Sequence, residues 1–145
     1  MAKRPSVLIV EARYYAHISD ALLKGAEAAL DAAGARYESV AVPGALEIPA
    51  AIALAAKTRR YDGYIALGCV IRGETTHYDH VCHECARGIQ NLALAGHAIG
   101  FGVLTVENID QAFARARVDE KDKGGEAARA CLAMVALRQK LKARR

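Results

Sequence analysis

The most informative stretch of the chain reads Gly68-Cys69-Val70-Ile71-Arg72-Gly73-Glu74-Thr75-Thr76-His77-Tyr78-Asp79. It begins inside an apolar run, residues 64–71, that is typical of a buried strand, and the run breaks at Arg72-Gly73 before a helix-like segment. A strand that ends in a glycine turn and leads into a helix leaves main-chain N–H groups free at one place, which favours an anion such as phosphate. His77 stands next to this turn, and imidazole exchanges protons readily near neutral pH. The stretch therefore predicts an anion-binding site with a proton-transferring group at its rim.

The rest of the chain alternates strand-like and helix-like segments around this one. Short apolar runs predict strands at residues 6–10 and 64–71, and strand-like segments follow at residues 37–42 and 99–104. Apolar residues at helical spacing predict helices over residues 18–33, 46–57, 81–94, 109–115 and from 124 or 125 to 141, with Gly34 and Gly96 as helix stops. Every connection between strands is long, so the strands should pair in parallel. We therefore expect an α/β three-layer sandwich: a four-stranded parallel sheet with flavodoxin-like strand order and right-handed crossovers, flanked by helices.

Length and composition are those of one globular domain, which we place at residues 1–145. The chain has 145 residues, of which 53% are apolar and 25% charged, and a chain of this length buries roughly two-thirds of its unfolded surface. No apolar run approaches the roughly 20 residues that span a bilayer, and residues 1–5 lack the apolar region of a signal peptide. We therefore expect a cytoplasmic protein with no membrane partner.

The net charge of +4 comes from the end of the chain. Five of the 20 basic residues lie within residues 138–145, and the remaining 15 nearly balance the 16 acidic residues. A basic tail can contact nucleic acid, but more often it is the solvated end of a final helix, and no aromatic residue is interleaved with these cations. We expect no nucleic-acid partner.

Parallel sheets place their functional loops at the carboxyl ends of the strands, so side chains that are far apart in sequence should meet there. These loops are residues 12–17, 43–47, 72–77 and 105–108. Tyr14 and Tyr15 in the first loop could stack on a planar heterocycle or simply pack on the surface. Glu47 could accept hydrogen bonds from a polyol or an amine, or could merely favour the helix start at which it lies. Arg115 and Lys123 could hold a phosphate, although the pattern is equally that of ordinary surface cations.

Residue types that bind metals cluster within residues 77–85: His77, His80, Cys82, His83 and Cys85. Cys82 and Cys85 form a C-x-x-C pattern that in a cytosolic chain could bind zinc or carry out redox chemistry. Each helical residue is rotated by about 100° from the last, so these side chains scatter around the helix and cannot close one tetrahedron. Cys82 would also lie a turn inside the helix, away from the N-terminus where the dipole lowers a thiol pKa. We expect free, mostly buried thiols and no metal, and the absence of a Gly-x-Gly-x-x-Gly or P-loop motif predicts no nucleotide cofactor.

Nearly the whole chain, residues 7–141, resembles the lumazine synthase family. Four segments carry the resemblance in the same order and at the same distances: Pro43-Gly44-Ala45-Leu46-Glu47-Ile48-Pro49, residues 68–79, Phe101-Gly102-Val103-Leu104-Thr105, and Asp122-Lys123-Gly124. The resemblance implies a transferase of riboflavin biosynthesis that condenses 5-amino-6-(D-ribitylamino)uracil with 3,4-dihydroxy-2-butanone 4-phosphate to 6,7-dimethyl-8-ribityllumazine, releasing phosphate and water. It implies no metal or organic cofactor, and self-association into homopentamers. The alternative is a non-catalytic flavin- or lumazine-binding protein on the same scaffold.

The resemblance also assigns roles to individual residues. It makes His77 the proton-transferring catalytic group and Arg115 the catalytic arginine that holds the phosphate. Glu74, Thr75 and Thr76 match the turn that binds the butanone phosphate, largely through main-chain N–H groups. The remaining matches are substrate contacts: Tyr14 on the pyrimidine ring, Ala45, Leu46 and Glu47 facing the ribityl chain and ring, Cys69, Val70 and Ile71 beside the uracil, and finally Lys123 and Phe101, the latter supplied by the neighbouring subunit.

Two residues depart from the family pattern. Tyr15 replaces the usual asparagine after the stacking aromatic, and Glu74 replaces a small residue, where a carboxylate repels phosphate unless it points away. Only 13 residues precede Tyr14, so we do not expect the extra N-terminal strand that many members lend to a neighbour. Bare pentamers are therefore the expected assembly, with decamers and sixty-subunit shells left open.

Overall fold

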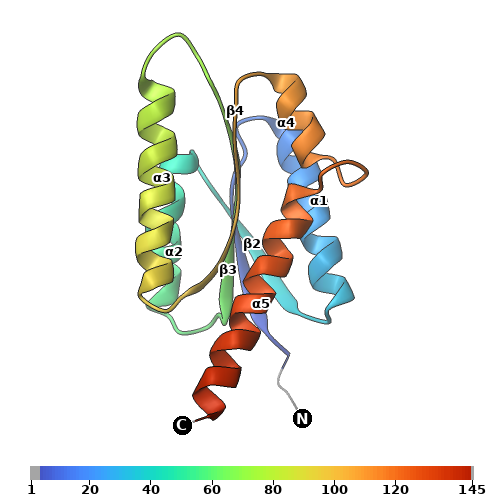
Figure 1. Ribbon diagram of the computed structural model, residues 1–145, viewed down its shortest axis with the longest axis vertical. Helices are drawn as coiled ribbons and strands as arrows, with labels where there is room; N and C mark the ends of the chain where they lie inside the picture. The colour runs from blue at the N-terminus through green and yellow to red at the C-terminus, as the bar shows by residue number, and fades with distance from the viewer. Residues whose placement is uncertain (1–3, 145) are drawn as a thin grey trace.

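The computed structural model describes residues 4–144 and shows an α/β sandwich built on a four-stranded sheet (Figure 1). The strands are β1 (Ser6–Ala12), β2 (Arg36–Val42), β3 (Gly63–Ile71) and β4 (Ala98–Val106). They lie in the order β2-β1-β3-β4, and each neighbouring pair is parallel. The predicted fold class and the flavodoxin-like strand order are confirmed.

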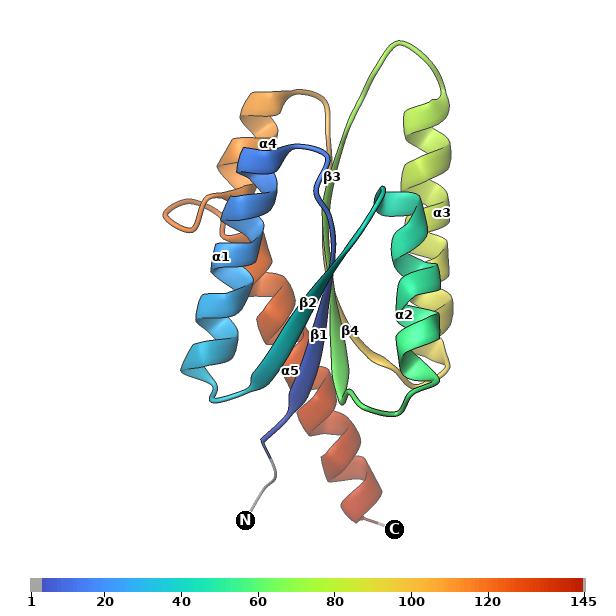
Figure 2. The ribbon, with the colours of Figure 1, turned by 180° about the vertical axis from the view of Figure 1, so that it is seen from behind.

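Helices cover both faces of the sheet, as Figures 1 and 2 show from opposite sides. One face carries α1 (Ala16–Ala32), α4 (Ile109–Ala116) and α5 (Lys123–Ala143). The other carries α2 (Ile48–Ala56), which the short 3-10 helix η1 (Ala45–Glu47) precedes, and α3 (His77–Leu94). No helix within residues 4–144 is both long enough and apolar enough to cross a membrane.

The continuous apolar run of β1 is explained by helices on both of its sides. Val7 and Ile9 are buried against the layer of α1, α4 and α5, while Leu8 and Val10 are buried against α2 and α3. Alternation along a strand sends successive side chains to opposite faces, and in a covered parallel sheet both faces must be apolar. Each such side chain stabilises the fold by about 1.5–3 kcal/mol. The centre of the sheet is therefore held by two apolar clusters, and the loops at its ends are free to carry polar groups.

The starts of α1, α2, α3 and α5 differ from the prediction by one to four residues, whereas two predicted helix stops agree with the structure. α3 begins at His77 rather than at residue 81, because its first turn lacks the apolar spacing on which the prediction relied. α5 begins at Lys123, since the Asp122 side chain accepts a hydrogen bond from a main-chain N–H and caps the helix. Lys123, which precedes the predicted helix, is therefore its first residue. Gly34 and Gly96 follow α1 and α3 with φ values of 71° and 105°, which confirms both predicted stops.

Candidate active site

The carboxyl ends of β1, β2 and β3 meet at one edge of the sheet, where the chain forms a cleft of about 420 Å³. Its walls come from the β1–α1 loop, the segment that enters α2, and the end of β3 with the first turns of α3. The lining residues are Ala12, Tyr14, Tyr15, Gly44, Ala45, Leu46, Glu47, Cys69, Val70, Ile71, His77 and Val81. Most of the predicted site residues are thus brought together from three separate parts of the sequence.

The β1–α1 loop presents an aromatic surface to the cleft. Tyr14 is 78% exposed, while Tyr15 is half-buried beneath it, with ring centroids 4.9 Å apart and planes inclined by 70°. Arg13 fixes the base of this loop, because its guanidinium donates to the buried carboxylate of Glu11 (2.6 Å) and to Asp20. Tyr15 therefore supports the loop by packing, where the family pattern has an amide side chain, and Tyr14 is left free to stack on a planar ligand.

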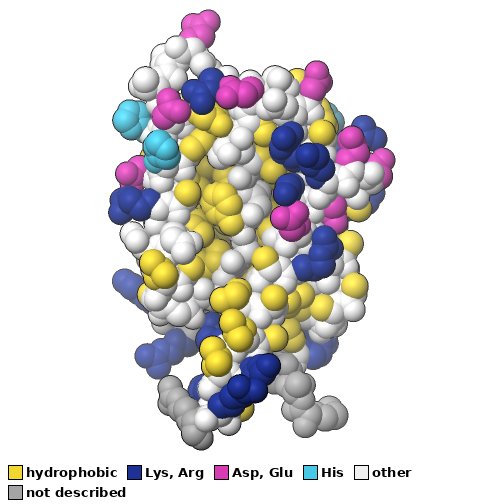
Figure 3. Space-filling view, viewed as in Figure 1, with side chains coloured by type: hydrophobic (Ala, Val, Ile, Leu, Met, Phe, Trp, Pro, Cys, Tyr) yellow, Lys and Arg dark blue, Asp and Glu magenta, His cyan; other side chains and the backbone are white. Residues whose placement is uncertain are grey.

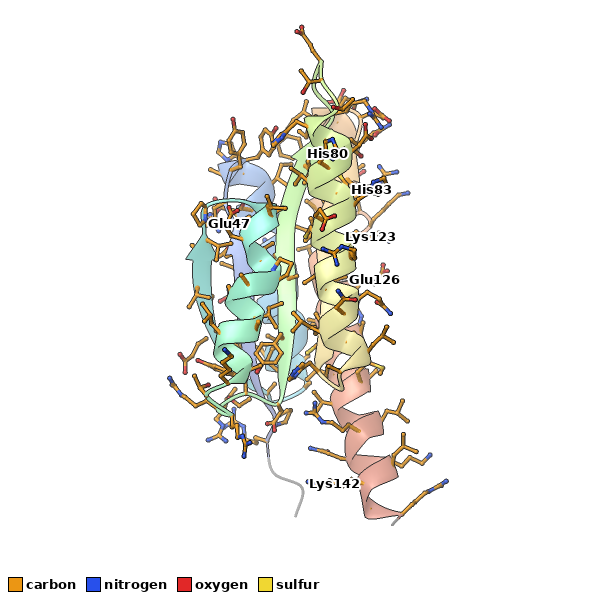
Figure 4. The ribbon with its side chains drawn as sticks, turned by 90° about the vertical axis from the view of Figure 1, so that its left-hand side faces the viewer. Glu47, His80, His83, Lys123, Glu126 and Lys142 are labelled. Carbon is orange, nitrogen blue, oxygen red and sulfur yellow. The ribbon has the colours of Figure 1, made fainter. Side chains whose placement is uncertain are left out.

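The segment after β2 supplies a small apolar wall and one carboxylate. Ala45 is buried and Leu46 is 48% exposed. Glu47 is the residue that precedes α2, and its side chain makes no capping hydrogen bond to that helix. The Glu47 carboxylate lies close to Gly44, where a Cβ atom would come within 3.2 Å of its Oε1. Figure 4 shows Glu47 at the top of α2, from where its carboxylate can accept hydrogen bonds from a bound polyol.

The β3–α3 turn is the polar end of the cleft. Within residues 4–144, the N–H groups of residues 73–76 donate no hydrogen bond to the chain. The His77 N–H donates to Thr75 Oγ1 at 3.3 Å, and the His77 side chain lines the cleft from the first position of α3. The positive end of the helix dipole lies at the same place. Free N–H donors, a helix N-terminus and an imidazole therefore lie at one place, as the pattern of residues 68–79 predicted.

Several predicted site residues lie outside this cleft. Glu74, Thr75 and Thr76 are exposed on the β3–α3 turn, and Arg115 lies half-buried in the last turn of α4, where Nη1 donates to the Gln111 carbonyl oxygen (3.1 Å). Within residues 4–144, Arg115 forms no ion pair with a carboxylate, so its charge is available to a ligand.

Phe101 and Lys123 are more distant still. Phe101 lies on the edge strand β4 with 44% of its surface exposed. The Lys123 Nζ is paired with Glu126 (3.1 Å) at the start of α5, which lies on the other face of the sheet from η1 and Glu47. The chain therefore does not bring Phe101 or Lys123 to the cleft that it forms itself.

The sequence reasoning missed four cleft residues. Ala12, Gly44 and Val81 line the cleft, and Tyr15 was noted as a departure but not assigned to the site. Ala12 and Gly44 could have been found, since both follow the predicted carboxyl ends of strands. Val81 gave no such signal, because its apolar side chain was accounted for as part of the helix core.

The four cysteines are free, and burial makes them poor nucleophiles. Burial raises the pKa of Cys69 and of Cys85 to about 11 and that of Cys131 to about 12, and it also raises the pKa of Cys82. Within residues 4–144, no group of three or more His, Cys, Asp or Glu side chains could hold a metal ion. The thiolate is the form that attacks electrophiles and binds zinc, so none of these thiols is primed for either role.

Native protein at pH 7.5 should therefore resist alkylation. We expect iodoacetamide to modify Cys85 and Cys131 at least about 100-fold more slowly in the folded protein than in urea, because only the protonated thiols are present and both are buried. Intact-mass spectrometry measures the adducts, and the urea-unfolded chain, which has four cysteines, is the control. Rapid double modification of Cys82 and Cys85 in the native protein would instead reveal a reactive pair.

The comparisons with known proteins identify the family. The family described as 6,7-dimethyl-8-ribityllumazine synthase matches residues 4–139. A protein of that name from Sphingopyxis alaskensis is 63% identical over 133 residues, which cover 92% of this chain and 94% of the relative. Proteins of the same name from Novosphingobium aromaticivorans (59% identity; 92% of this chain, 96% of the relative) and Bartonella tribocorum (57%; 97% and 94%) are similarly close. With this sheet, this cleft and relatives aligned along nearly their whole length, the chain belongs to the 6,7-dimethyl-8-ribityllumazine synthase family.

Proposed function

We propose that this protein is a transferase that condenses 5-amino-6-(D-ribitylamino)uracil with 3,4-dihydroxy-2-butanone 4-phosphate to 6,7-dimethyl-8-ribityllumazine, with release of phosphate and water, in riboflavin biosynthesis. The observation that carries the proposal is the coincidence of His77 with the unpaired N–H groups of residues 73–76 at one end of the cleft. The names of the relatives, at 57–63% identity, point to the same reaction.

The reaction needs orientation and proton transfer more than it needs a strong electrophile. The uracil amine attacks the ketone and water leaves as an imine forms; phosphate is then eliminated, and ring closure releases a second water. His77 is placed to move protons in these steps, since it lies beside the turn that would hold the phosphate. Arg115 would add a fixed positive charge to the leaving phosphate. No step calls for a metal or an organic cofactor.

The other residues of the cleft would hold the pyrimidine substrate. The open face of Tyr14 would stack on the ring, and η1 (residues 45–47) and the end of β3 (residues 69–71) would enclose the ring and the ribityl chain. Glu47 would accept hydrogen bonds from ribityl hydroxyls. Two reactants held in register in this way can gain several orders of magnitude in rate from proximity alone.

A direct assay tests the activity. Purified protein is mixed with both substrates, and lumazine absorbance is followed against a protein-free control, because the two substrates also react spontaneously. The proposal predicts a rate proportional to protein concentration and above the spontaneous one. Binding of lumazine or flavin without acceleration would favour the non-catalytic carrier.

The protein should also assemble, because its exposed β4 side is apolar. Figure 3 shows apolar side chains gathered between α3 and α5. Phe101 on β4, Leu94 at the end of α3, and Met134 and Leu137 on α5 are each at least 42% exposed, and a hollow of about 520 Å³ lies between the ends of α3 and α5. Self-association into homopentamers would cover this surface and could deliver Phe101, which the subunit's own cleft lacks, to a neighbour's cleft.

Mixed oligomers test this shared site. His77→Ala and Phe101→Ala subunits, each of low activity alone, should regain activity when refolded together. About a quarter of the interfaces in an equal mixture would pair an intact His77 with an intact Phe101 from the neighbour. The comparison sample is the same two variants mixed as preformed oligomers without refolding. If the refolded mixture has only the mean activity of the two separate variants, both residues act in the site of one subunit. Sedimentation of the purified protein measures the assembly itself.

A further inference from the structure

Arg72 is the first residue after β3, and its contacts reach two other elements at the sheet edge. Its main-chain N–H donates to the carbonyl oxygen of Val106, the last residue of β4, at 2.9 Å. Its side-chain Nε donates to the Glu107 carboxylate at 2.8 Å and lies in an ion pair with it, and Nη1 donates to Asp79 at 3.4 Å. One residue thus connects the ends of β3 and β4 with the first turn of α3.

An aromatic ring also holds the guanidinium, and the backbone of its partner Glu107 is itself fixed. The guanidinium carbon lies 4.3 Å from the centre of the Tyr78 ring, within the range of a cation–π contact. The Glu107 N–H donates to the Gln111 side chain at 2.8 Å, and the Gln111 N–H donates to the side chain of Asn108, the cap of α4, at 2.9 Å. Arg72 is therefore anchored on the folded start of α4 and on the aromatic ring of α3.

The segment enclosed by these contacts is the one that carries the proposed chemistry. Residues 73–76 form the turn with the unpaired N–H groups, His77 begins α3, and Tyr78 and Asp79, which Arg72 holds, follow immediately. Arg72 does not line the cleft, and its donors are directed to Glu107 and Asp79. It can therefore act on the substrates only through the segment that it braces.

We propose that Arg72 is a positioning residue, which sets the separation and orientation of the phosphate-binding turn and His77 by clamping the first turn of α3 to the β4–α4 junction. The inference rests on the proposed function. It adds to that function the contact that keeps the phosphate-binding turn and His77 at a fixed separation and orientation. Exposed ion pairs contribute little to folding, and the Arg72 side chain is 41% exposed. A misplacement of about 1 Å in an active site, by contrast, can cost about 100-fold in rate. Arg72 should matter much more for turnover than for stability.

The test compares Arg72→Ala with Arg87→Ala, which removes an exposed arginine of α3 that is paired with a single carboxylate, Glu84, at 2.6 Å. For Arg72→Ala we expect kcat to fall by about 10- to 100-fold. KM for the pyrimidine should stay within about twofold, and Tm should shift by less than about 4 °C. Amide hydrogen exchange of the peptide that spans residues 73–77 should accelerate. Arg87→Ala should leave kcat and this exchange unchanged.

Three further variants separate a positioning role of Arg72 from an effect of its positive charge alone. Glu107→Gln should reproduce part of the loss in kcat, and the Arg72→Ala/Glu107→Gln double variant should lose less than the product of the two single losses, because both break one contact. Arg72→Lys should recover part of kcat, since one ammonium can reach Glu107 but cannot serve Glu107 and Asp79 together.

The outcomes distinguish this inference from the function on which it rests. Unchanged kcat and unchanged exchange in Arg72→Ala overturn it. A rise in KM for the butanone phosphate alone also overturns it, because Arg72 would then bind the phosphate directly, and so does a loss of activity that follows the loss of folded protein. If the wild-type protein makes no lumazine, the proposed function fails, while the exchange measurement still decides whether Arg72 holds the turn.

Discussion

Replacing His77 with alanine is expected to slow lumazine formation by about 10- to 100-fold, at or below the lower end of the roughly 100- to 10,000-fold that general acid–base catalysis contributes. The loss is not expected to be larger, because His77 is exposed at the cleft, so water can take over part of the proton transfer. Assembly and Tm should be unchanged, since the imidazole packs in neither apolar cluster. Steady-state kinetics with both substrates and sedimentation of the same sample measure the two effects.

A neighbouring histidine provides the matched control. His80 lies on the same helix and is exposed, but it does not line the cleft. His80→Ala should therefore keep wild-type turnover. Equal rates for His77→Ala and the wild-type protein would remove His77 from the mechanism, and equal losses in both variants would point to a general disturbance of α3.

Replacing Gly100 with alanine should destabilise the fold more than any loop substitution. A Cβ atom on Gly100 would lie 1.8 Å from the Ala127 carbonyl oxygen, so β4 and α5 would have to move apart. The clash would be between main-chain atoms of β4 and α5, which cannot rotate away as a side chain can. Substitutions of this kind are exceptional and lower the free energy of unfolding by about 4 kcal/mol or more. For a domain of this size the Tm would fall by roughly 10 °C or more. Thermal unfolding followed by circular dichroism at fixed protein concentration measures the change.

Two other glycines calibrate this prediction. At Gly102 the nearest atom is a flexible one, Leu67 Cδ2 at 2.8 Å, so Gly102→Ala should cost clearly less. At Gly73 a Cβ would meet no atom within 4 Å, and Gly73→Ala should leave Tm unchanged. The expected order of loss is Gly100, Gly102, Gly73, and a Gly100→Ala protein as stable as the Gly73→Ala protein would contradict the close approach of α5 to β4.

The fold was predictable because its signals are local. β1 and β3 are compact apolar runs, and glycines with positive φ end α1 and α3 as their sequence positions indicated. The start of α3 was not predictable in this way. Its first turn, from His77 to His80, is held by main-chain hydrogen bonds to the Thr76 carbonyl oxygen and by the contact of Asp79 with Arg72, and it shows no apolar spacing.

The candidate site was predictable to the extent that strand ends determine it. Tyr14, Glu47 and His77 follow three different strands, and parallel pairing alone requires that they meet at one edge. Phe101 could not be placed from this rule, because its position on an edge strand gives it no cleft within its own subunit. Arg72 gave no signal in the sequence either, since its partner Glu107 is 35 positions away and the pairing depends on the register of β3 with β4.

The central claim is that main-chain amides and an imidazole share one end of the sheet and hold a departing phosphate between them. A crystal structure of the protein soaked with an unreactive phosphorylated analogue of the butanone measures this directly. We expect the phosphate oxygens about 2.7–3.2 Å from N–H groups of residues 74–76, with the His77 imidazole alongside. Ligand density at any other place, for example at the basic end of α5, would contradict the account.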